Sequence, residues 1–120
     1  MGDFEIVFYS QADGTKPVKD FLNSLNVKMK AKIVRATVML QKNGPALREP
    51  YSKPLGDGIF ELRAKVATDI TRVLYFFFVG RRVVLTNGFV KKTQETPVSE
   101  IERAKRYRAE YLGRKESKHD

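Results

Sequence analysis

The spacing of apolar residues changes once along this chain, and this change constrains the fold more than any other feature of the sequence. Over residues 17–43 apolar side chains recur every three or four positions, which is typical of amphipathic helices. From Ile59 to Val90 they alternate with polar ones or form short runs, which is typical of β-strands. Helices followed by a block of strands predict an α+β fold, with an antiparallel sheet segregated from its helices.

A short strand and two helices are expected in the first part of the chain. Residues 4–9 form an apolar and aromatic run of strand length. Pro17 suits the first position of a helix over residues 17–25, because the N–H that proline lacks needs no partner there. Asn26 can cap a longer second helix, which Gly44-Pro45 would end. The second helix carries the apolar positions Met29, Ile33, Ala36 and Leu40, and its other faces hold Lys28, Lys30, Lys32 and Arg35.

Three consecutive strands are expected after residues 45–58, a segment rich in proline and glycine that indicates a loop. Thr68-Asp69 and Gly80-Arg81 are the expected turns, and the second would be a two-residue type II′ turn because Gly takes its first position. The strands themselves are expected over residues 59–66, 70–79 and 83–90.

A last helix is expected after the strands, since Thr96 and Pro97 would cap and open it and its apolar stripe ends near Leu112. Residues 113–120, which include His119, the only histidine, are expected to form a flexible tail. The whole chain, residues 1–120, is expected to be one domain.

The turns would decide which side chains of neighbouring strands face each other. Turns at the expected positions place Lys65 opposite Arg72, and Arg72 opposite Phe89. One face of the sheet would carry Arg63, Lys65, Arg72, Phe89 and Lys91, together with Leu74, Phe76, Val83 and Leu85. The opposite face would be apolar and covered by the first two helices, with Phe60, Leu62, Val66, Val73, Tyr75, Phe77, Val84 and Val90.

The cations on this face predict a site for a polyanion. The net charge of +9 favours nucleic acid, an anionic membrane or an acidic protein as partner. Glu61 is the only acid in these strands apart from the turn residue Asp69, so the cations have no matching row of carboxylates. Such a cluster is costly without a bound anion, which predicts a phosphate site with Phe89 as a stacking surface for a base. The alternatives are solvated strand arginines, and Lys91-Lys92 as protection of a strand end against aggregation.

Several other classes of site lack the residues that they need. The chain has no cysteine, and one histidine with scattered acids gives no ligand spacing, so no metal site is expected. No glycine-rich phosphate loop occurs and no serine lies near a histidine, so neither a nucleotide cofactor nor a serine triad is expected. Without a signal-peptide pattern or an apolar run of membrane-span length, a cytoplasmic protein is expected.

Four segments together carry a more specific signal. They are Lys-Pro-Leu-Gly-Asp-Gly-Ile-Phe-Glu-Leu-Arg (53–63), Arg-Val-Leu-Tyr (72–75), Gly-Phe-Val-Lys-Lys-Thr-Gln-Glu-Thr-Pro (88–97) and Glu-Ile-Glu-Arg-Ala (100–104). In these motifs, and over residues 4–112, the chain resembles the HigB-type, phage-derived branch of the RelE/ParE toxin superfamily. The resemblance implies a RelE-like domain and a metal-independent endoribonuclease that cuts mRNA, usually in the ribosomal A site. It also implies inhibition by a HigA-like antitoxin, whose helix-turn-helix binds operator DNA.

The resemblance also implies roles for individual residues. Arg63 and Arg72 match strand arginines that would clamp the non-bridging phosphate oxygens. Lys91 or Lys92 would add charge or protonate the leaving 5′-oxygen, and Lys53 matches a lysine near the scissile phosphate. Lys65, Phe89, Lys92 and Tyr51 would bind the RNA. Relatives carry a Tyr or His near the end of the last strand, where this chain has neither, so Tyr51 or a lysine would have to transfer the proton.

Two other functions stay open at this stage. One is a ParE-like inhibitor of DNA gyrase, and the other is a phage remnant that binds RNA or an antitoxin without catalysis. The fold cannot separate them, because activity resides in the site. We expect an acidic or amphipathic segment of the antitoxin to cover the cationic face, and the free protein to expose Leu74, Phe76 and Leu85.

Overall fold

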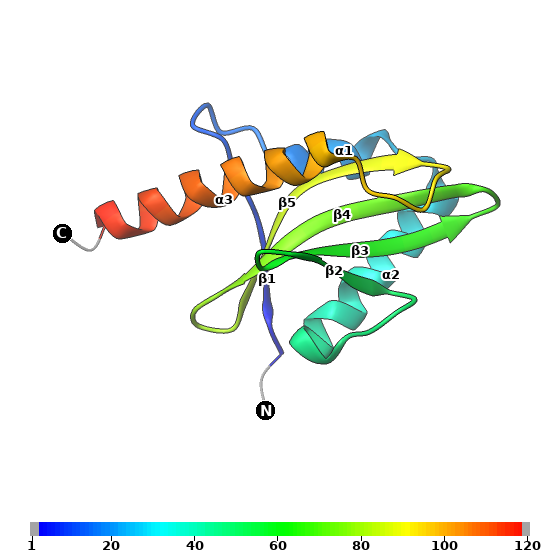
Figure 1. Cartoon of the computed structure of the whole chain (residues 1–120), viewed down its shortest axis with the longest axis horizontal. Helices are drawn as coiled ribbons and strands as arrows, with labels where there is room; N and C mark the ends of the chain where they lie inside the picture. The colour runs from blue at the N-terminus through cyan, green and yellow to red at the C-terminus, as the bar shows by residue number, and fades with distance from the viewer. Residues whose placement is uncertain (1–2, 119–120) are drawn as a thin grey trace.

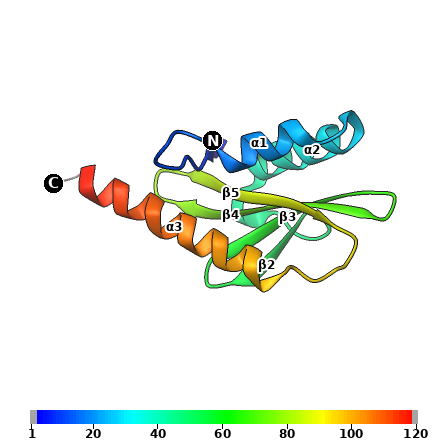
Figure 2. The ribbon, with the colours of Figure 1, turned by 90° about the horizontal axis from the view of Figure 1, so that it is seen from above.

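A computed structural model describes residues 3–118 as one α+β domain built in three layers (Figures 1 and 2). Its elements are β1 (Glu5–Phe8), α1 (Pro17–Ser24), α2 (Val27–Asn43), the 3₁₀ helix η1 (Gly44–Ala46), β2 (Ser52–Gly56), β3 (Ile59–Val66), β4 (Asp69–Phe78), β5 (Arg82–Lys91) and α3 (Val98–Lys118). The strands form one sheet in the order β1-β5-β4-β3-β2. Figure 2 shows α1 and α2 on one face of this sheet and α3 on the other.

The first two helices begin and end where the sequence predicts. α1 has Pro17 at its first position, and the Asn26 side chain caps α2 by accepting a hydrogen bond from the Met29 N–H at 2.9 Å. Gly44 ends α2 with a φ of 53°, a conformation that glycine adopts without steric cost. The predicted apolar row of α2, Met29, Ile33, Ala36 and Leu40, is buried against the sheet.

Two strands at the edges of the sheet differ from the sequence expectation. β1 pairs in parallel with β5, so the sheet is not wholly antiparallel. β2 lies within the segment expected to be a loop and pairs antiparallel with β3, with an irregular register between Pro54 and Gly56. An edge strand tolerates proline and glycine because one side of its backbone needs no partner. The proline and glycine content of this segment therefore indicates a loop where the structure has a strand.

The turn between β3 and β4 lies at Ala67-Thr68, one residue earlier than the expected Thr68-Asp69. Arg63 therefore faces Arg72, and the expected pairing of Lys65 with Arg72 is wrong. The pairing is shifted by two residues, and side chains alternate with a period of two. Arg63 and Lys65 consequently stay on the face where the sequence places them.

The turn between β4 and β5 has three residues, 79–81, rather than two, with positive φ at both Gly80 and Arg81. A bulge at Thr86 then adds one residue to β5, because Leu74 lies opposite Asn87 while Tyr75 lies opposite Leu85. The two deviations cancel beyond the bulge, so Arg72 faces Phe89 as predicted.

The bulge also exchanges side chains between the two faces. Val84, expected under the first two helices, belongs to the core beneath α3, whereas Val83 and Leu85 belong to the core beneath α1 and α2. Leu74, Phe76 and Leu85 are buried, so the expectation that they form an exposed apolar patch is wrong.

Helix α3 continues to Lys118, so the prediction of a helix ending near Leu112 and a flexible tail from Gly113 is wrong for residues 113–118; His119 lies outside the described residues. Tyr9 anchors the helix, since its hydroxyl donates to the Glu110 carboxylate and its ring stacks on Tyr107 at 4.5 Å between centroids. Burial and the bond to Glu110 raise the pKa of Tyr9 to about 12. Of the helices in residues 3–118, none combines the length and apolar character that crossing a bilayer requires.

Candidate nucleic-acid interface

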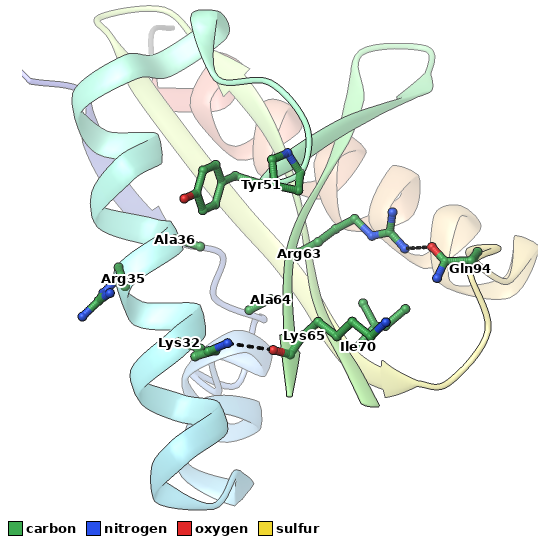
Figure 3. A pocket seen from close by; sticks show the side chains of 10 residues that line it. Lys32, Arg35, Ala36, Tyr51, Arg63, Ala64, Lys65, Ile70 and Gln94 are labelled. Carbon is green, nitrogen blue, oxygen red and sulfur yellow. Dashed lines mark hydrogen bonds between the residues drawn. The ribbon is translucent and has the colours of Figure 1, made fainter. Parts of the chain in front are cut away.

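The candidate site is a pocket of about 440 Å³ beside the part of β3 that extends past β2 (Figure 3). The pairing of β2 with β3 stops at Ser52 opposite Leu62, and one further bond joins the Arg63 N–H to the Tyr51 carbonyl at 2.8 Å. The end of β3 therefore borders an open space between α2 and the segment that follows β5. The pocket is lined by Lys32, Arg35, Ala36, Pro50, Tyr51, Arg63, Ala64, Lys65, Ile70 and Gln94.

The pocket lining carries four cations and no acid. Lys32 extends from α2 toward β3, whereas the guanidinium of Arg35 points away from β3; Arg63 and Lys65 extend from β3 toward the segment that holds Gln94 (Figure 3). The Lys32 amine donates to the Lys65 carbonyl at 3.1 Å, which ties the helix to the strand edge. Tyr51, whose half-exposed ring extends toward α2 (Figure 3), adds a flat apolar surface to the same lining. Cations beside an accessible aromatic ring are what a single-stranded nucleic acid requires of a binding site.

Arg63 is held in place by two contacts. Its Nη2 donates to the Gln94 Oε1 at 2.8 Å, and its Nε lies 3.1 Å from the Glu61 Oε1. The side chain stays 15 % exposed, so the guanidinium borders the pocket while its orientation is set from behind. An arginine fixed in this way can present its remaining donors to a phosphate with little loss of conformational entropy.

Arg72, directly opposite Arg63, is fully buried, and both of its terminal nitrogens donate to backbone carbonyls inside the protein. Its Nη1 donates to the Glu95 carbonyl at 2.9 Å, its Nη2 donates to the Thr93 carbonyl, and its Nε lies 3.8 Å from the Glu61 carboxylate. Burial lowers the pKa of the Arg72 guanidinium, and the negative charge of Glu61 opposes this shift. Arg72 therefore holds residues 93–95 against the sheet.

Glu61 lies at the centre of this arrangement and is also fully buried. It pairs with both arginines and accepts a hydrogen bond from the Thr96 hydroxyl. Helix α3 begins at Val98, one residue after the Pro97 that the sequence places first in this helix. The sequence predicts that no row of carboxylates matches these cations; Glu61, the only carboxylate of these strands away from a turn, pairs with both arginines. Phe89 is also buried, with the Arg72 guanidinium 5.8 Å from its ring centroid, so in this structure its ring is not open to a base.

A comparison with known protein families shows which family this chain belongs to. Residues 20–109 match the family described as phage-derived protein Gp49-like (DUF891), a stretch that contains every residue of the pocket. The chain belongs to this Gp49-like family. The family falls within the RelE/ParE-like superfamily of toxins from toxin–antitoxin systems, which confirms the superfamily predicted from the sequence. A comparison with curated proteins gives no match.

The remaining predicted residues of the Gp49-like chain lie around the pocket rather than in it. Lys53, Lys91 and Lys92 are exposed and do not belong to the lining. Lys91 is the register partner of Ile70, a lining residue, so it stands at the rim. Lys53 is the register partner of Glu61, farther along the sheet edge.

Three polar or charged lining residues were not among the predicted site residues: Lys32, Arg35 and Gln94. The sequence places Lys32 and Arg35 on the cationic side of a helix, but it contains no signal for where that helix crosses the sheet. Gln94 lies in an irregular segment whose path depends on Arg72 and Glu61. Among residues 3–118 there is no cluster of three or more His, Cys, Asp or Glu side chains that could hold a metal ion.

Proposed function

We propose that this Gp49-like protein is the toxin of a type II toxin–antitoxin pair and that it cuts mRNA on the ribosome, in the cytoplasm, without a metal. The observation that carries the proposal is the pocket lined by Arg63, which Gln94 and Glu61 hold, by three further cations and by Tyr51. Its partner would be a HigA-like antitoxin with a helix-turn-helix that binds operator DNA.

The reaction uses the RNA's own 2′-hydroxyl as the nucleophile. A bond forms from the 2′-oxygen to the adjacent phosphorus and the bond from phosphorus to the 5′-oxygen breaks, which leaves a 2′,3′-cyclic phosphate and a 5′-hydroxyl. The 2′-hydroxyl gives its proton to a solvent water, and the leaving 5′-oxygen gains one from the protein. The protein must align the two oxygens and stabilise the extra negative charge on the phosphorane.

Arg63 is the residue best placed to stabilise that charge, because its guanidinium is fixed at the pocket while part of it stays accessible. Lys65 lies beside it on the same face of β3 and would donate the proton to the 5′-oxygen. The ring of Tyr51 would stack on a neighbouring base, and Lys32 and Arg35 would bind the flanking phosphates.

The residues outside the pocket take different roles. Lys91, Lys92 and Lys53 would contact phosphates beyond the pocket, since they are exposed around it. Arg72 would position the segment that carries Gln94 instead of touching the phosphate, because it is fully buried and its terminal nitrogens donate to residues of that segment.

We propose the ribosome as the site of action because the pocket lining lacks the usual proton acceptors. None of the ten lining residues is a carboxylate or a histidine, the side chains that most often accept a proton in catalysis. Alignment of the mRNA by the ribosome would therefore supply much of the rate increase. The same observation favours the alternative functions, a gyrase inhibitor or a binder without catalysis, so the test must separate all three.

The test is induced expression of the wild type and of Arg63→Ala/Lys65→Ala, with mRNA 5′ ends mapped across the transcriptome. The proposal predicts new ends within translated frames for the wild type alone. Lys19→Ala/Arg106→Ala is the matched control, because it removes the same charge from exposed positions outside the pocket and should cut like the wild type. Growth arrest without new ends would indicate gyrase or another bound target. No arrest from any variant would indicate a binding protein without catalysis.

A further inference from the structure

The outer face of α2 carries an apolar stripe that the fold does not use. Val27, Ala31, Val34 and Val38 are exposed, with 87, 42 and 43 % of the residue surface accessible at the three valines. Spacings of four, three and four residues place them within an arc of about 60° on the helix. The buried row of α2 lies on the opposite side, so the stripe faces away from the sheet.

All charged side chains of the helix that carries the stripe are positive. α2 contains no Asp or Glu, and its cations are Lys28, Lys30, Lys32, Arg35 and Lys42. At about 100° per residue, Lys28, Arg35 and Lys42 fall on one flank of the stripe and Lys30 falls on the other. Each flank of the apolar surface therefore presents positive charge.

We infer that this α2 stripe is a docking surface for an acidic amphipathic helix of the antitoxin. An apolar row at spacings of three and four residues fits the apolar row of a second helix, and small β-branched side chains allow two helices to approach closely. The cations on the flanks would pair with acidic residues on either side of the partner's apolar row. Only the identity of the partner rests on the toxin–antitoxin function proposed above.

Two other occupants fit the stripe less well. A second copy of this chain would bring two rows of cations together, which is unfavourable for a protein of net charge +9. Helices that lie on a membrane surface insert Trp, Phe or Leu, and the stripe offers only valine and alanine. Charge and side-chain size both favour a protein helix.

The docking surface borders the candidate nucleic-acid interface. Lys32 and Arg35 belong to the same helix as the stripe and line the pocket beside β3 (Figure 3). Arg35 stands on the flank of the stripe, so acidic residues of a helix seated there would neutralise this lining cation. The antitoxin could thus weaken RNA binding without filling the pocket.

The test measures the affinity of purified variants for the immobilised cognate antitoxin by biolayer interferometry. All variants carry Arg63→Ala, so that expression is possible whether or not the chain is a nuclease and so that binding is measured apart from activity. Val34→Asp/Val38→Asp should raise the Kd at least about tenfold, because it places acids against an acidic apolar partner. Val34→Lys/Val38→Lys should raise it less. Val79→Asp is the matched control, because this exposed valine lies in the β4–β5 turn, and its Kd should stay within about twofold.

The outcomes separate the occupants. A Kd for Val34→Asp/Val38→Asp that equals the control's would overturn the inference, and so would a larger effect of lysine than of aspartate. Sedimentation of the parent as a dimer and of the aspartate variant as a monomer would show that the occupant is a second copy. Circular dichroism checks that each variant folds, and a single Val38→Asp replaces the double variant should that one unfold. If the docking result holds while mRNA cleavage fails, only the proposed nuclease activity is wrong.

Discussion

Arg63 and Arg72 face each other on neighbouring strands, yet the fold uses them in opposite ways. Arg72 lies in the interior of the sheet, on β4, and the segment after β5 folds over it, so every contact of its guanidinium is internal. Arg63 lies on β3 where β2 no longer covers the edge, so part of its side chain stays accessible. Position relative to the sheet edge, rather than residue type, separates the two roles.

Glu61 joins these two regions, because its two oxygens face one arginine each. A buried carboxylate is costly unless it is paired, and the buried arginine supplies that charge. Glu61 can then orient the accessible arginine at the pocket. The buried pair thus acts as the support, and Arg63 acts as the contact with the ligand.

The largest effect is expected for Arg72→Ala, which tests whether Arg72 supports the fold. This substitution leaves Glu61 buried with less compensating charge. We expect the free energy of unfolding to fall by about 3–5 kcal/mol, measured by urea denaturation. Arg103→Ala, which removes a half-exposed arginine paired with Glu100, should change it by less than about 0.5 kcal/mol. Equal effects from the two substitutions would mean that Arg72 does not support the fold. Since loss of the fold also removes activity, Arg72→Ala alone cannot test catalysis.

Arg63→Ala should give the converse result, with a large loss of activity and a smaller loss of stability. The cleavage rate on ribosome-bound mRNA should fall about 100- to 1000-fold, as it does when an enzyme loses one donor to the transition-state charge. Glu61 would keep Arg72 and Thr96 as partners, so the variant should stay folded. Single-turnover cleavage and thermal melting check the two parts. A rate close to that of the wild type would remove Arg63 from the chemistry.

The sequence predicts most of the helices and strands that carry this site, but not which of its side chains are buried. Proline, asparagine and glycine at the helix ends predict α1 and α2, because these residues act locally. The bulge at Thr86 has no local signal, and the pairing of Arg72 with Phe89 is predicted only because the longer turn offsets it. A correct register can therefore rest on two errors that cancel.

Burial could not be predicted because it depends on contacts between distant segments. Arg72 is covered by residues 93–95, about 20 positions along the chain, and nothing in its own strand indicates this cover. The pocket likewise forms where α2 crosses the end of β3, so Lys32 and Arg35 join Arg63 through tertiary packing alone. Alternation assigns a side chain to a face, but it cannot say what covers that face.

A smaller effect is expected at Tyr51, which lines the accessible pocket together with Arg63. Tyr51→Ala should weaken binding of a short single-stranded RNA by about 1–3 kcal/mol, because one stacking surface is lost. Tyr51→Phe keeps the ring and should bind like the wild type. Fluorescence anisotropy with a labelled RNA measures both. If phenylalanine weakens binding as much as alanine does, the hydroxyl rather than the ring makes the contact.

The smallest effect is expected at a pair that contrasts with Glu61 and Arg72 in being exposed. The Lys105 amine lies 2.9 Å from the Asp57 carboxylate and joins α3 to the β2–β3 turn, and its hydrogen bond and charge lower the pKa of Asp57. A carboxylate whose pKa is lower in the folded protein than in the unfolded chain stabilises the fold at pH values above its unfolded pKa. This contribution is lost as the pH falls through the pKa of the folded protein. Asp57→Asn should therefore lower the Tm slightly at neutral pH and leave it unchanged in acid, where the wild-type carboxylate is protonated. About 1 M NaCl should also remove the difference, because salt screens exposed charges. A Tm difference that persists in acid and in salt would show that the turn depends on the hydrogen bond or on packing at Asp57 rather than on its charge.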